Sequence, residues 1–528
     1  MKIRSLILCL LLFQNLLAQQ SGTTASESWY LKDAKIDRVQ GISVEKTYTK
    51  LLKNKPSKTI LVAVIDSGVD IDHEDLKDNV WINTGEIAGN GIDDDNNGYV
   101  DDIHGWNFLG GKNGNVTFAP LELSRIYRDL KSKYEIDSAA RDTTTTEYKL
   151  WKDVSKKYIV ERDFNLDQYG YYQMLQKNFQ WYSLLMKSKL KTDSLTIEKI
   201  EAFVPMDSTA NKGKRFMMLV NDYYGSIDGF DDYIDYFKSE VNKYDIESDV
   251  RSIVGDDPKN LYEKGYGNND VEGPDARHGT HVSGIIAAVR DNHLGINGIA
   301  NNVKIMPIRA VPDGDERDKD IANAILYAVD NGAQIINMSF GKPYSPQKEA
   351  VDKAVRYAEE KGVLMVHGAG NESLDIDTHD SFPTRKLANG KSVNNWLEVG
   401  ASSRSDNHHL VAEFSNFGQK EVDVFAPGVD IYSTTPDNTY ESLDGTSMAA
   451  PVVSGAAALI MSYYPTLSAV QVIDIIKKTA KTYPKLMVIT PGTENDETLF
   501  SDLSSSGGVV NVYKAMKMAE KVSRKQKE

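Results

Sequence analysis

From about residue 58 the sequence alternates short, continuously apolar runs with helical patterns. The run KTILVAVID ends at Asp66 and is followed by Ser-Gly, which predicts a strand buried on both faces and then a turn. The similar runs are VKIMPIRAV, AQIINMSF, GVLMVHGAG, WLEVGAS and VDVFAPG. Between them, DIANAILYAVDNG and QKEAVDKAVRYAEEKG predict helices that end at Gly332 and Gly362. This alternation predicts an α/β fold, with a doubly wound, mostly parallel central sheet and helices on both of its faces.

A long polar segment interrupts the alternation. Residues 116–265 are rich in tyrosine and show few strand patterns. Within them Leu175, Phe179, Tyr182 and Leu185 follow helical spacing, which indicates an amphipathic helix. The sequence therefore predicts a helical insertion in the α/β fold.

The N-terminus has the pattern of a secretory signal peptide. Lys2 and Arg4 precede an apolar run, Leu6–Leu17, and the small residue Ala18 follows it. The run is too short to span a bilayer, so we expect cleavage after Ala18 and no transmembrane anchor. The expected location is secreted or periplasmic/cell envelope, and the sequence leaves open whether it is periplasm, cell surface or medium.

Cys9 is the only cysteine in the chain and lies inside the apolar run. A lipoprotein anchored at Cys9 is the alternative to a cleaved secretory peptide, but Leu8 is bulky for that cleavage site. Without Cys9 the mature chain would be neither a cysteine hydrolase nor a Cys-ligated zinc protein. The net charge of −15 argues against a nucleic-acid partner.

Three reactive side chains stand where a strand ends or a helix begins. Asp66 ends a strand, His278 opens the helical run RHGTHVSGIIAA, and Ser447 opens the run GTSMAAPVVSGAAAL. Each alone is ordinarily a turn, structural or capping residue. Together they have a mechanism, because histidine can take the proton of serine while a carboxylate orients and stabilises the imidazole.

Two further features suit an acyl-transfer site. Ser447 at a helix N-terminus has free backbone N–H groups beside it, and its own N–H can donate to an oxyanion. Gly445 permits a sharp entry to the helix, and Pro451 falls in the first turn, where its missing N–H costs little. Asn371, after a strand and a Gly-Ala-Gly bend, can present a second donor, although an asparagine there is commonly just a turn residue.

The blocks VAVIDSGV, HGTHVSGIIAA, GAGN and GTSMAAPVVSGAAAL resemble, in order, the four motif blocks of the subtilisin-like serine peptidases, or subtilases. The resemblance covers roughly 27–115 and 266–520 and implies a subtilisin-like fold and serine endopeptidase activity on protein or peptide substrates. It implies that Ser447 is the nucleophile, His278 the base, Asp66 the orienting carboxylate and Asn371 an oxyanion donor. The expected division of the chain is a signal peptide (1–18), two parts of the catalytic domain (19–115 and 266–520), the insertion (116–265) and a polar tail (521–528).

The resemblance also implies a substrate-binding surface. Ser339, Phe340 and Gly341 would pair with the substrate backbone by strand addition. Gly368, Ala369 and Gly370 would help to wall the pocket for the residue before the cleaved bond. Glu372 could favour a basic side chain in that pocket, although a solvated surface acid is the simpler interpretation.

The segment GIDDDNNGYVDD indicates a calcium loop. The spacing matches positions 1, 3, 5, 7 and 9 of an EF-hand-type loop, with Gly98 at the turn. The expected ligands are Asp93, Asp95, Asn97, Tyr99 and Asp101. His104 stands where the usual Glu would be, so completion by Asp102 is one possibility, and a solvated acidic turn is the alternative.

A second calcium site is implied by the resemblance alone. Asp75 matches a calcium-binding aspartate of the family, and RDNHLGINGIA resembles its calcium loop. The loop would offer the Asn292 side chain and the carbonyls of Arg290, Leu294 and Ile296. A plain helix-terminal loop is the alternative. Structural Ca2+, at one or two sites, would supply stability that disulfides do not.

Subtilases usually carry an N-terminal propeptide of several tens of residues. Here only about forty residues separate the predicted signal peptide from the strand at Asp66, and SWYLKDAKIDRVQGISVEKTYTKLL among them resembles the start of a mature catalytic domain. Control of activity is therefore expected to differ, and the insertion is either a lid beside the cleft or a spacer or docking surface. A non-catalytic binding protein with this fold, or an acid-active Ser-Glu-Asp peptidase, are the competing functions, and the intact catalytic blocks disfavour both. The sequence leaves the oligomeric state open.

Overall fold

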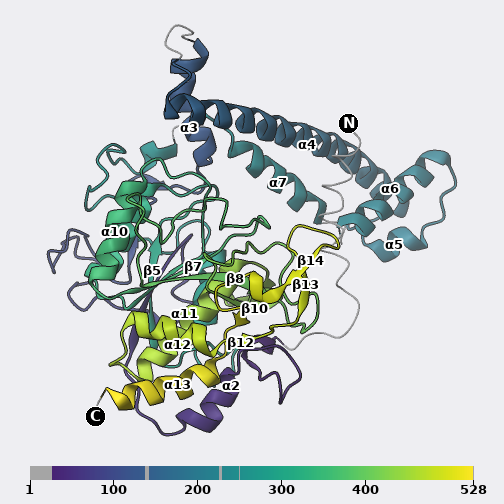
Figure 1. Cartoon of the computed structure of the whole chain (residues 1–528). Helices are drawn as coiled ribbons and strands as arrows, with labels where there is room; N and C mark the ends of the chain where they lie inside the picture. Colours follow the sequence, from purple (N-terminus) through teal and green to yellow (C-terminus); the bar gives the residue numbers. More distant parts are fainter. Residues whose placement is uncertain (1–26, 137–141, 225–228, 249, 527–528) are drawn as a thin grey trace.

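The apolar runs pair side by side in one nine-stranded sheet (Figure 1). The structure is a computed structural model that describes residues 27–136, 142–224, 229–248 and 250–526. The strand order is β12-β15-β9-β8-β7-β6-β1-β5-β2, and every neighbouring pair is parallel except β12 with β15. The strands are β1 (Ile60–Asp66), β2 (Trp106–Asn107), β5 (Val303–Arg309), β6 (Ile335–Met338), β7 (Leu364–Gly368), β8 (Trp396–Ser402), β9 (Val424–Pro427), β12 (Lys481–Thr482) and β15 (Gly508–Val509).

Helices cover both faces of this sheet, as the sequence predicts. On β1, Val62 and Val64 face a core shared with α8 and α11, whereas Ala63 and Ile65 face a core shared with α9 and α10. Successive side chains of a strand point to opposite faces, so a continuous apolar run is what a sheet buried on both sides requires. The covering helices are α8 (Arg277–Ala287), α9 (Asp318–Asp330), α10 (Lys348–Glu360), α11 (Thr446–Tyr463), α12 (Ala469–Thr479) and α13 (Val512–Lys525), with the short α2 (Val44–Thr47) beside α13.

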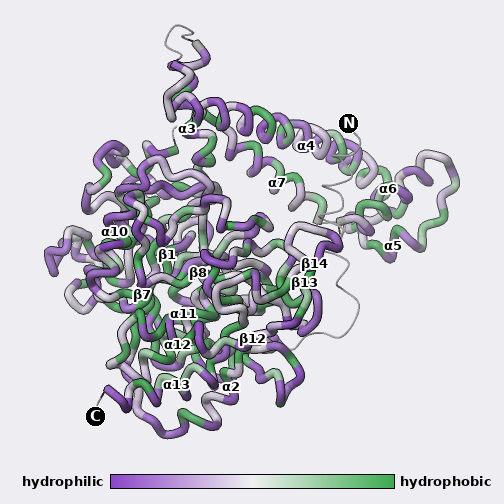
Figure 2. The backbone as a smooth tube through the Cα atoms, in the orientation of Figure 1, coloured by the Kyte–Doolittle hydropathy of each residue, from purple (hydrophilic) through white to green (hydrophobic). Residues whose placement is uncertain are grey.

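Outside the nine-stranded sheet, the described residues form three small antiparallel hairpins. They are β3 (Gly110–Gly111) with β4 (Gly114–Asn115), β10 (Ile431–Thr435) with β11 (Thr439–Leu443), and β13 (Met487–Ile489) with β14 (Glu497–Leu499). Figure 2 shows hydrophobic residues along the central strands and α11, and hydrophilic residues along the outer loops.

Helix α11 is apolar along its whole length because it is a core helix. By length and hydropathy it is the one helix in the described ranges that could cross a membrane, but 89% of it is buried inside the protein. Its alanines and Gly455 let it approach neighbouring elements closely, and a Cβ at Gly455 would lie 2.8 Å from a side-chain atom of Ile299. Its hydropathy therefore reflects packing.

Between β4 and α8 the chain forms a set of helices that projects from the sheet (Figure 1). The 45-residue α4 is its longest element. Aromatic side chains bind its base together, with Tyr127 stacked on Tyr158 at a centroid distance of 4.0 Å and on Trp151 at 5.3 Å. The helices are α3 (Glu122–Lys131), α4 (Thr146–Leu190), α5 (Ile197–Ala202), α6 (Ser208–Tyr224) and α7 (Gly229–Asn242).

The base of these helices is fixed to the loop after β5. The Ala119 N–H donates to the Asp313 carbonyl, and the Asp313 N–H donates to the Thr117 carbonyl. On the other side of the loop, Ser239 of α7 and the nearby Lys243 contact the Asp313 carboxylate. The helices thus begin and end at one loop of the α/β body.

Candidate active site

Asp66 and His278 come together at the carboxyl end of β1. Asp66 is the last residue of β1 and is buried, and His278 is in the first turn of α8. The His278 Nδ1 atom lies 2.7 Å from Asp66 Oδ1, which also accepts the Ser67 N–H at 2.8 Å. A carboxylate bound to Nδ1 leaves Nε2 as the nitrogen that can take a proton.

The electrostatics of this pair favour the protonated imidazole. Desolvation lowers the pKa of His278, but the charge of Asp66 and its hydrogen bond outweigh it, so the pKa lies above the usual 6.5. The His278 side chain remains 38% exposed, whereas the Asp66 side chain is 2% exposed. The imidazole therefore faces solvent while its partner carboxylate is enclosed.

Ser447 is the second residue of α11 and lines the same cavity as this pair. The cavity has a volume of about 470 Å³, and Asp66, His278, Asn371 and Ser447 all line it. In the structure the Ser447 hydroxyl donates to the Ser339 carbonyl at 3.1 Å. Among the described residues there is no hydrogen bond between Ser447 and His278. The two side chains therefore line one cavity, but the expected contact between the serine hydroxyl and the imidazole is not formed.

Asn371 is oriented by the residue before Ser447. Its Oδ1 accepts from the Thr446 N–H at 2.9 Å and from the Thr446 hydroxyl at 3.1 Å. Because an N–H can only donate, this contact assigns the amide oxygen to Thr446. The Asn371 NH2 group then has no hydrogen bond among the described residues, at the wall of the cavity.

The segments expected to bind substrate lie around this cavity, with one difference. Ser339, Phe340, Gly341, Gly368 and Gly370 line it. The Ala369 side chain is fully buried in the core around Phe425, so it supports the wall from behind. The cavity also has acidic lining residues that the sequence patterns did not indicate, namely Asp275, Asp313, Glu316 and Asp380.

Glu372 also lines the cavity, and it is tethered. Its Oε2 accepts from the Asn416 amide at 2.7 Å, and the same amide donates to the Ala369 carbonyl at 2.9 Å. The carboxylate is therefore held at the cavity wall.

In the predicted EF-hand-type loop, aspartate side chains accept hydrogen bonds from backbone N–H groups of the same segment. Asp93 accepts the N–H groups of Asn97 and Gly98 at 3.0 and 2.8 Å, and Asp101 accepts those of Asn90 and Gly91 at 3.2 and 2.8 Å. The same loop carries Asp95, Asn97 and Tyr99. The Tyr99 ring is buried in the core against Trp106.

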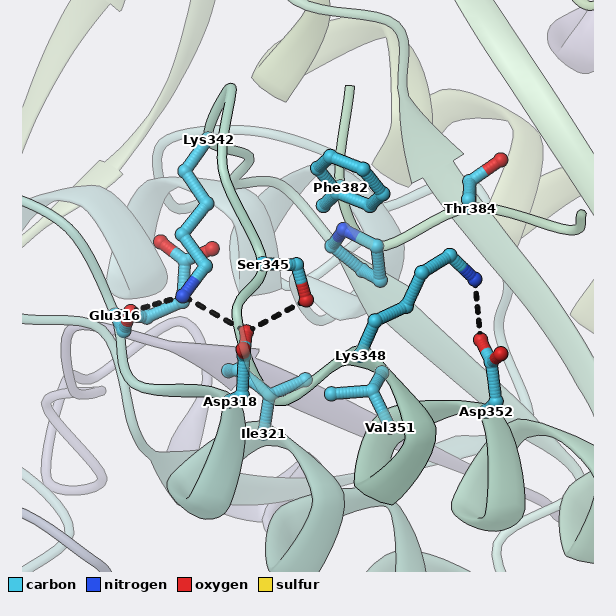
Figure 3. Close-up of a pocket in the computed structure, with 11 residues that line it drawn as sticks. Glu316, Asp318, Ile321, Lys342, Ser345, Lys348, Val351, Asp352, Phe382 and Thr384 are labelled. Carbon is cyan, nitrogen blue, oxygen red and sulfur yellow. Dashed lines mark hydrogen bonds and ion pairs between the residues drawn. The ribbon is translucent and has the colours of Figure 1, made fainter. Parts of the chain in front are cut away.

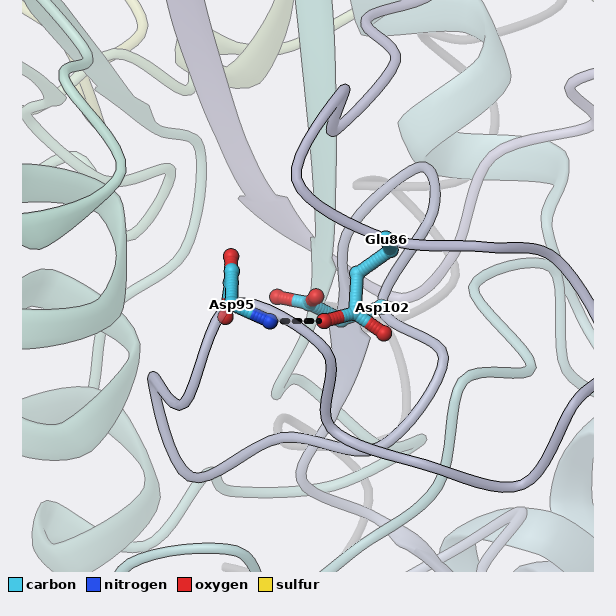
Figure 4. Close-up of side chains that lie close together, drawn as sticks. All are labelled: Glu86, Asp95 and Asp102. Carbon is cyan, nitrogen blue, oxygen red and sulfur yellow. Dashed lines mark hydrogen bonds between the residues drawn. The ribbon is translucent and has the colours of Figure 1, made fainter.

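Among the described residues, one group of carboxylates that lie close together consists of Glu86, Asp95 and Asp102 (Figure 4). Their oxygens lie within 4.8 Å of one another, and Asn83 donates to both Asp95 and Asp102 at 2.9 Å. Desolvation is the largest cause that raises the pKa of Asp102 to about 6. Three carboxylates with oxygen donors alone fit a hard cation such as Ca2+. The sequence pattern missed Glu86 because it precedes the repeat by several residues.

The second candidate centres on Asp75, which is fully buried. Its Oδ1 accepts from the Asn292 amide at 2.7 Å, and its Oδ2 from the Ile296 N–H at 3.1 Å. The loop that carries Arg290, Leu294 and Ile296 winds around it, with positive φ at Asp291 and His293. Burial raises the pKa of Asp75, and no ion pair of this carboxylate is seen in the described part of the chain. A buried carboxylate beside a wound loop fits a calcium ion.

The predicted signal peptide, 1–18, lies outside the described residues.

Comparisons with known proteins identify the family to which the chain belongs. The model of the subtilase family matches residues 57–507. The chain is 44% identical over 207 residues to subtilisin DY of Bacillus licheniformis, covering 38% of this chain and 70% of that one. It is 43% identical over 203 residues to a thermophilic serine proteinase of Bacillus sp. (strain AK1), covering 38% and 47%. A solved structure of a protease from Pseudoalteromonas arctica PAMC 21717 aligns with 93% of this chain and 97% of its own, at 18% identity and a TM-score of 0.49. With the family model matching most of its length, the chain belongs to the subtilase family and is a serine-type endopeptidase.

Proposed function

We propose that this protein hydrolyses peptide bonds through an acyl-enzyme on Ser447. The observation that carries the proposal is the 2.7 Å contact between Asp66 and His278 at the wall of the cavity that Ser447 also lines. His278 Nε2 takes the serine proton as Oγ attacks the scissile carbonyl, and returns it to the leaving amine. Asp66 holds the tautomer and stabilises the imidazolium.

The attack requires the Ser447 hydroxyl to leave the Ser339 carbonyl. Rotation about the Cα–Cβ bond of Ser447 would redirect Oγ toward the imidazole, and such hydrogen bonds commonly tighten only when substrate binds. Water then attacks the acyl-enzyme with His278 again acting as the base.

The oxyanion of the tetrahedral intermediate would lie between two donors. One is the Ser447 N–H at the start of α11, where the helix dipole favours negative charge. The other is the NH2 group of Asn371, left available because Thr446 occupies the amide oxygen. Both donors are fixed before substrate arrives.

Ca2+ is proposed at two sites as a structural ion. Glu86, Asp95 and Asp102 would hold one ion, with neighbouring oxygens of the 93–101 loop. Asp75 and the 290–296 loop would hold the other. The first ion would neutralise three carboxylates that repel one another when bare, and the second would compensate the buried charge of Asp75.

We also propose that the protein is exported and acts on protein or peptide substrates.

The insertion, whose base contacts Asp313 at the cavity wall, is proposed as a lid. Deleting it and assaying casein beside short peptides tests this. Unchanged rates on both substrates with normal folding would leave it a spacer or docking surface.

The proposed mechanism is tested by comparing wild type with Ser447→Ala. Wild type should hydrolyse peptides and react with a fluorophosphonate probe, and Ser447→Ala should do neither. A folded wild-type protein that binds peptides without cleaving them would instead be a non-catalytic binding protein.

A further inference from the structure

A buried histidine lies directly beneath the segment expected to bind substrate. His367, on β7, is fully enclosed, and it precedes Gly368 of the cavity wall. Its Nε2 lies 2.7 Å from the Phe340 carbonyl, and its Nδ1 lies 2.7 Å from Oε1 of Glu398 on β8. The mechanism above gives this group no role.

The contacts of His367 fix where its protons are. A carbonyl oxygen can only accept, so Nε2 carries a hydrogen and donates it to Phe340. Nδ1 faces a carboxylate, and a second proton lies between these two atoms. The other oxygen of Glu398 accepts from the Trp396 indole at 2.7 Å.

The result is a buried, charge-assisted pair that holds the ring in one orientation. Desolvation lowers the pKa of His367, but the Glu398 carboxylate outweighs it and raises the pKa above the usual value. The imidazole also packs against the Trp396 ring, tilted by 47° at a centroid distance of 5.4 Å, so it has little freedom to rotate.

The segment above His367 is anchored at both ends. At one end the Ser339 hydroxyl donates to the Ser447 carbonyl at 2.9 Å. At the other end the Lys342 N–H donates to the Phe382 carbonyl at 3.0 Å, and the Phe382 N–H returns a bond at 2.9 Å. The Lys342 ammonium is buried and pairs with Asp318 at 2.8 Å (Figure 3).

Between these anchors, His367 is the hydrogen-bond partner of the Phe340 carbonyl among the described residues. This bond turns the carbonyl inward, and the peptide unit is rigid and planar. Its direction therefore sets how the Gly341 N–H is presented at the cavity. A Cβ at Gly341 would lie 3.7 Å from His367 Nε2, so the ring packs directly under this residue.

We propose that His367 is a positioning residue: it holds the Phe340–Gly341 peptide in the orientation that pairs with an extended substrate. This rests on the proposed function, in which Ser339, Phe340 and Gly341 bind substrate backbone. The substrates affected are peptides long enough to lie along that segment. A small ester that reaches only Ser447 does not use it.

Three substitutions at His367 test whether a hydrogen-bond donor must stand at the position of Nε2. In His367→Gln the amide nitrogen stands as many bonds from Cα as Nε2, so it can donate to Phe340. In His367→Asn the amide reaches only as far as Nδ1 and loses that contact. His367→Met keeps the volume and has no donor.

The assay measures kcat and KM on an extended peptide and the acylation rate with a small nitrophenyl ester. We expect about a tenfold rise in KM for His367→Met and His367→Asn on the peptide, with kcat and ester acylation within about twofold of wild type. His367→Gln should return KM to within about threefold of wild type. Circular dichroism verifies folding, and if His367→Met does not fold, the Asn and Gln variants decide.

A peptide KM for folded His367→Asn within twofold of wild type would overturn the proposal. So would an equal loss on peptide and ester, because that would place the damage at Ser447. If wild type itself cleaves neither substrate, the proposed function has failed, and that outcome is distinct because it does not depend on residue 367.

Discussion

Asp66 Oδ1 and His278 Nδ1 lie 2.7 Å apart although 212 positions separate them in the chain. The carboxyl end of β1 and the first turn of α8 create this contact, and sites in open α/β sheets form at such strand ends. Asp66→Asn should keep the side chain's shape and present the wrong hydrogen-bond partner to Nδ1. We expect kcat to fall about 10^4-fold, the loss general for triad carboxylates, including subtilisin. Steady-state kinetics of the folded variant measures this, and a loss below tenfold would contradict the assigned role.

The oxyanion role of Asn371 gives a different signature. Asn371→Leu keeps a similar volume and removes the NH2 donor. We expect kcat to fall about 10²- to 10³-fold with little change in KM, the size established for the corresponding donor of subtilisin. A rise in KM with unchanged kcat would show instead that Asn371 contributes only to ground-state binding.

The raised pKa of His278 predicts the acid limb of activity. Catalysis needs the neutral imidazole, so kcat/KM should fall as pH falls through a midpoint above 6.5. The effect on stability has the opposite sign: the charged pair stabilises the fold below the unfolded pKa, and this is lost as pH rises through the folded pKa. Because Asp66 raises the pKa, the midpoint of residual activity in Asp66→Asn should move to lower pH. An unchanged midpoint would mean that another group controls the limb.

Calcium should raise the melting temperature of the protein, and the size of this increase should depend on the carboxylates of the two proposed sites. An ion at a hundred times its Kd stabilises a one-site protein by about 2.7 kcal/mol. Asp102→Asn and Asp75→Asn should each remove part of the calcium-dependent shift. Asp78→Asn, which changes an exposed acid with the same loss of charge, is the control. Scanning calorimetry with Ca2+ and with a calcium chelator measures the shifts, and equal shifts in all three variants would argue against both sites.

A buried ion-pair network joins the segment before α8 to α9. Arg251 pairs with Asp256 and Asp320, at 2.6 and 2.7 Å, and both carboxylates are fully buried. Arg251→Met leaves the buried Asp320 without its cation and Asp256 with Lys319 alone, and we expect a loss of about 3–5 kcal/mol in the free energy of unfolding. The exposed pair Lys189–Asp207 is the control, and Lys189→Met should cost much less, because solvent screens an exposed pair. Urea unfolding measures both, and similar losses would contradict the dependence on burial.

The features that the sequence predicted have a strong local signal. The strand at Asp66 is apolar without interruption, and a sheet covered on both faces accounts for that pattern. The four candidate catalytic residues each lie at or after a strand end or in the first turn of a helix, and they line one cavity: Asp66, His278, Asn371 and Ser447. Their motifs were therefore enough to predict that they lie together.

Other features depend on side-chain geometry that spacing does not encode. The direction of the Ser447 hydroxyl is set by the Ser339 carbonyl, a contact between distant segments. Glu86 joins Asp95 and Asp102 because the loop folds back on itself, which a pattern of alternating acids does not specify. His367 stands inside an apolar run, and only the pairing of β7 with β8 places it beside Glu398.

The most direct measurement is the rate at which a fluorophosphonate modifies Ser447, located by peptide mass spectrometry, in wild type and in His278→Ala. We predict a single adduct on Ser447 in wild type and a loss of at least about 10³-fold in its rate of formation in the variant. An adduct on another residue, or equal rates in the two folded proteins, would contradict the assignment of Ser447 and His278 as nucleophile and base.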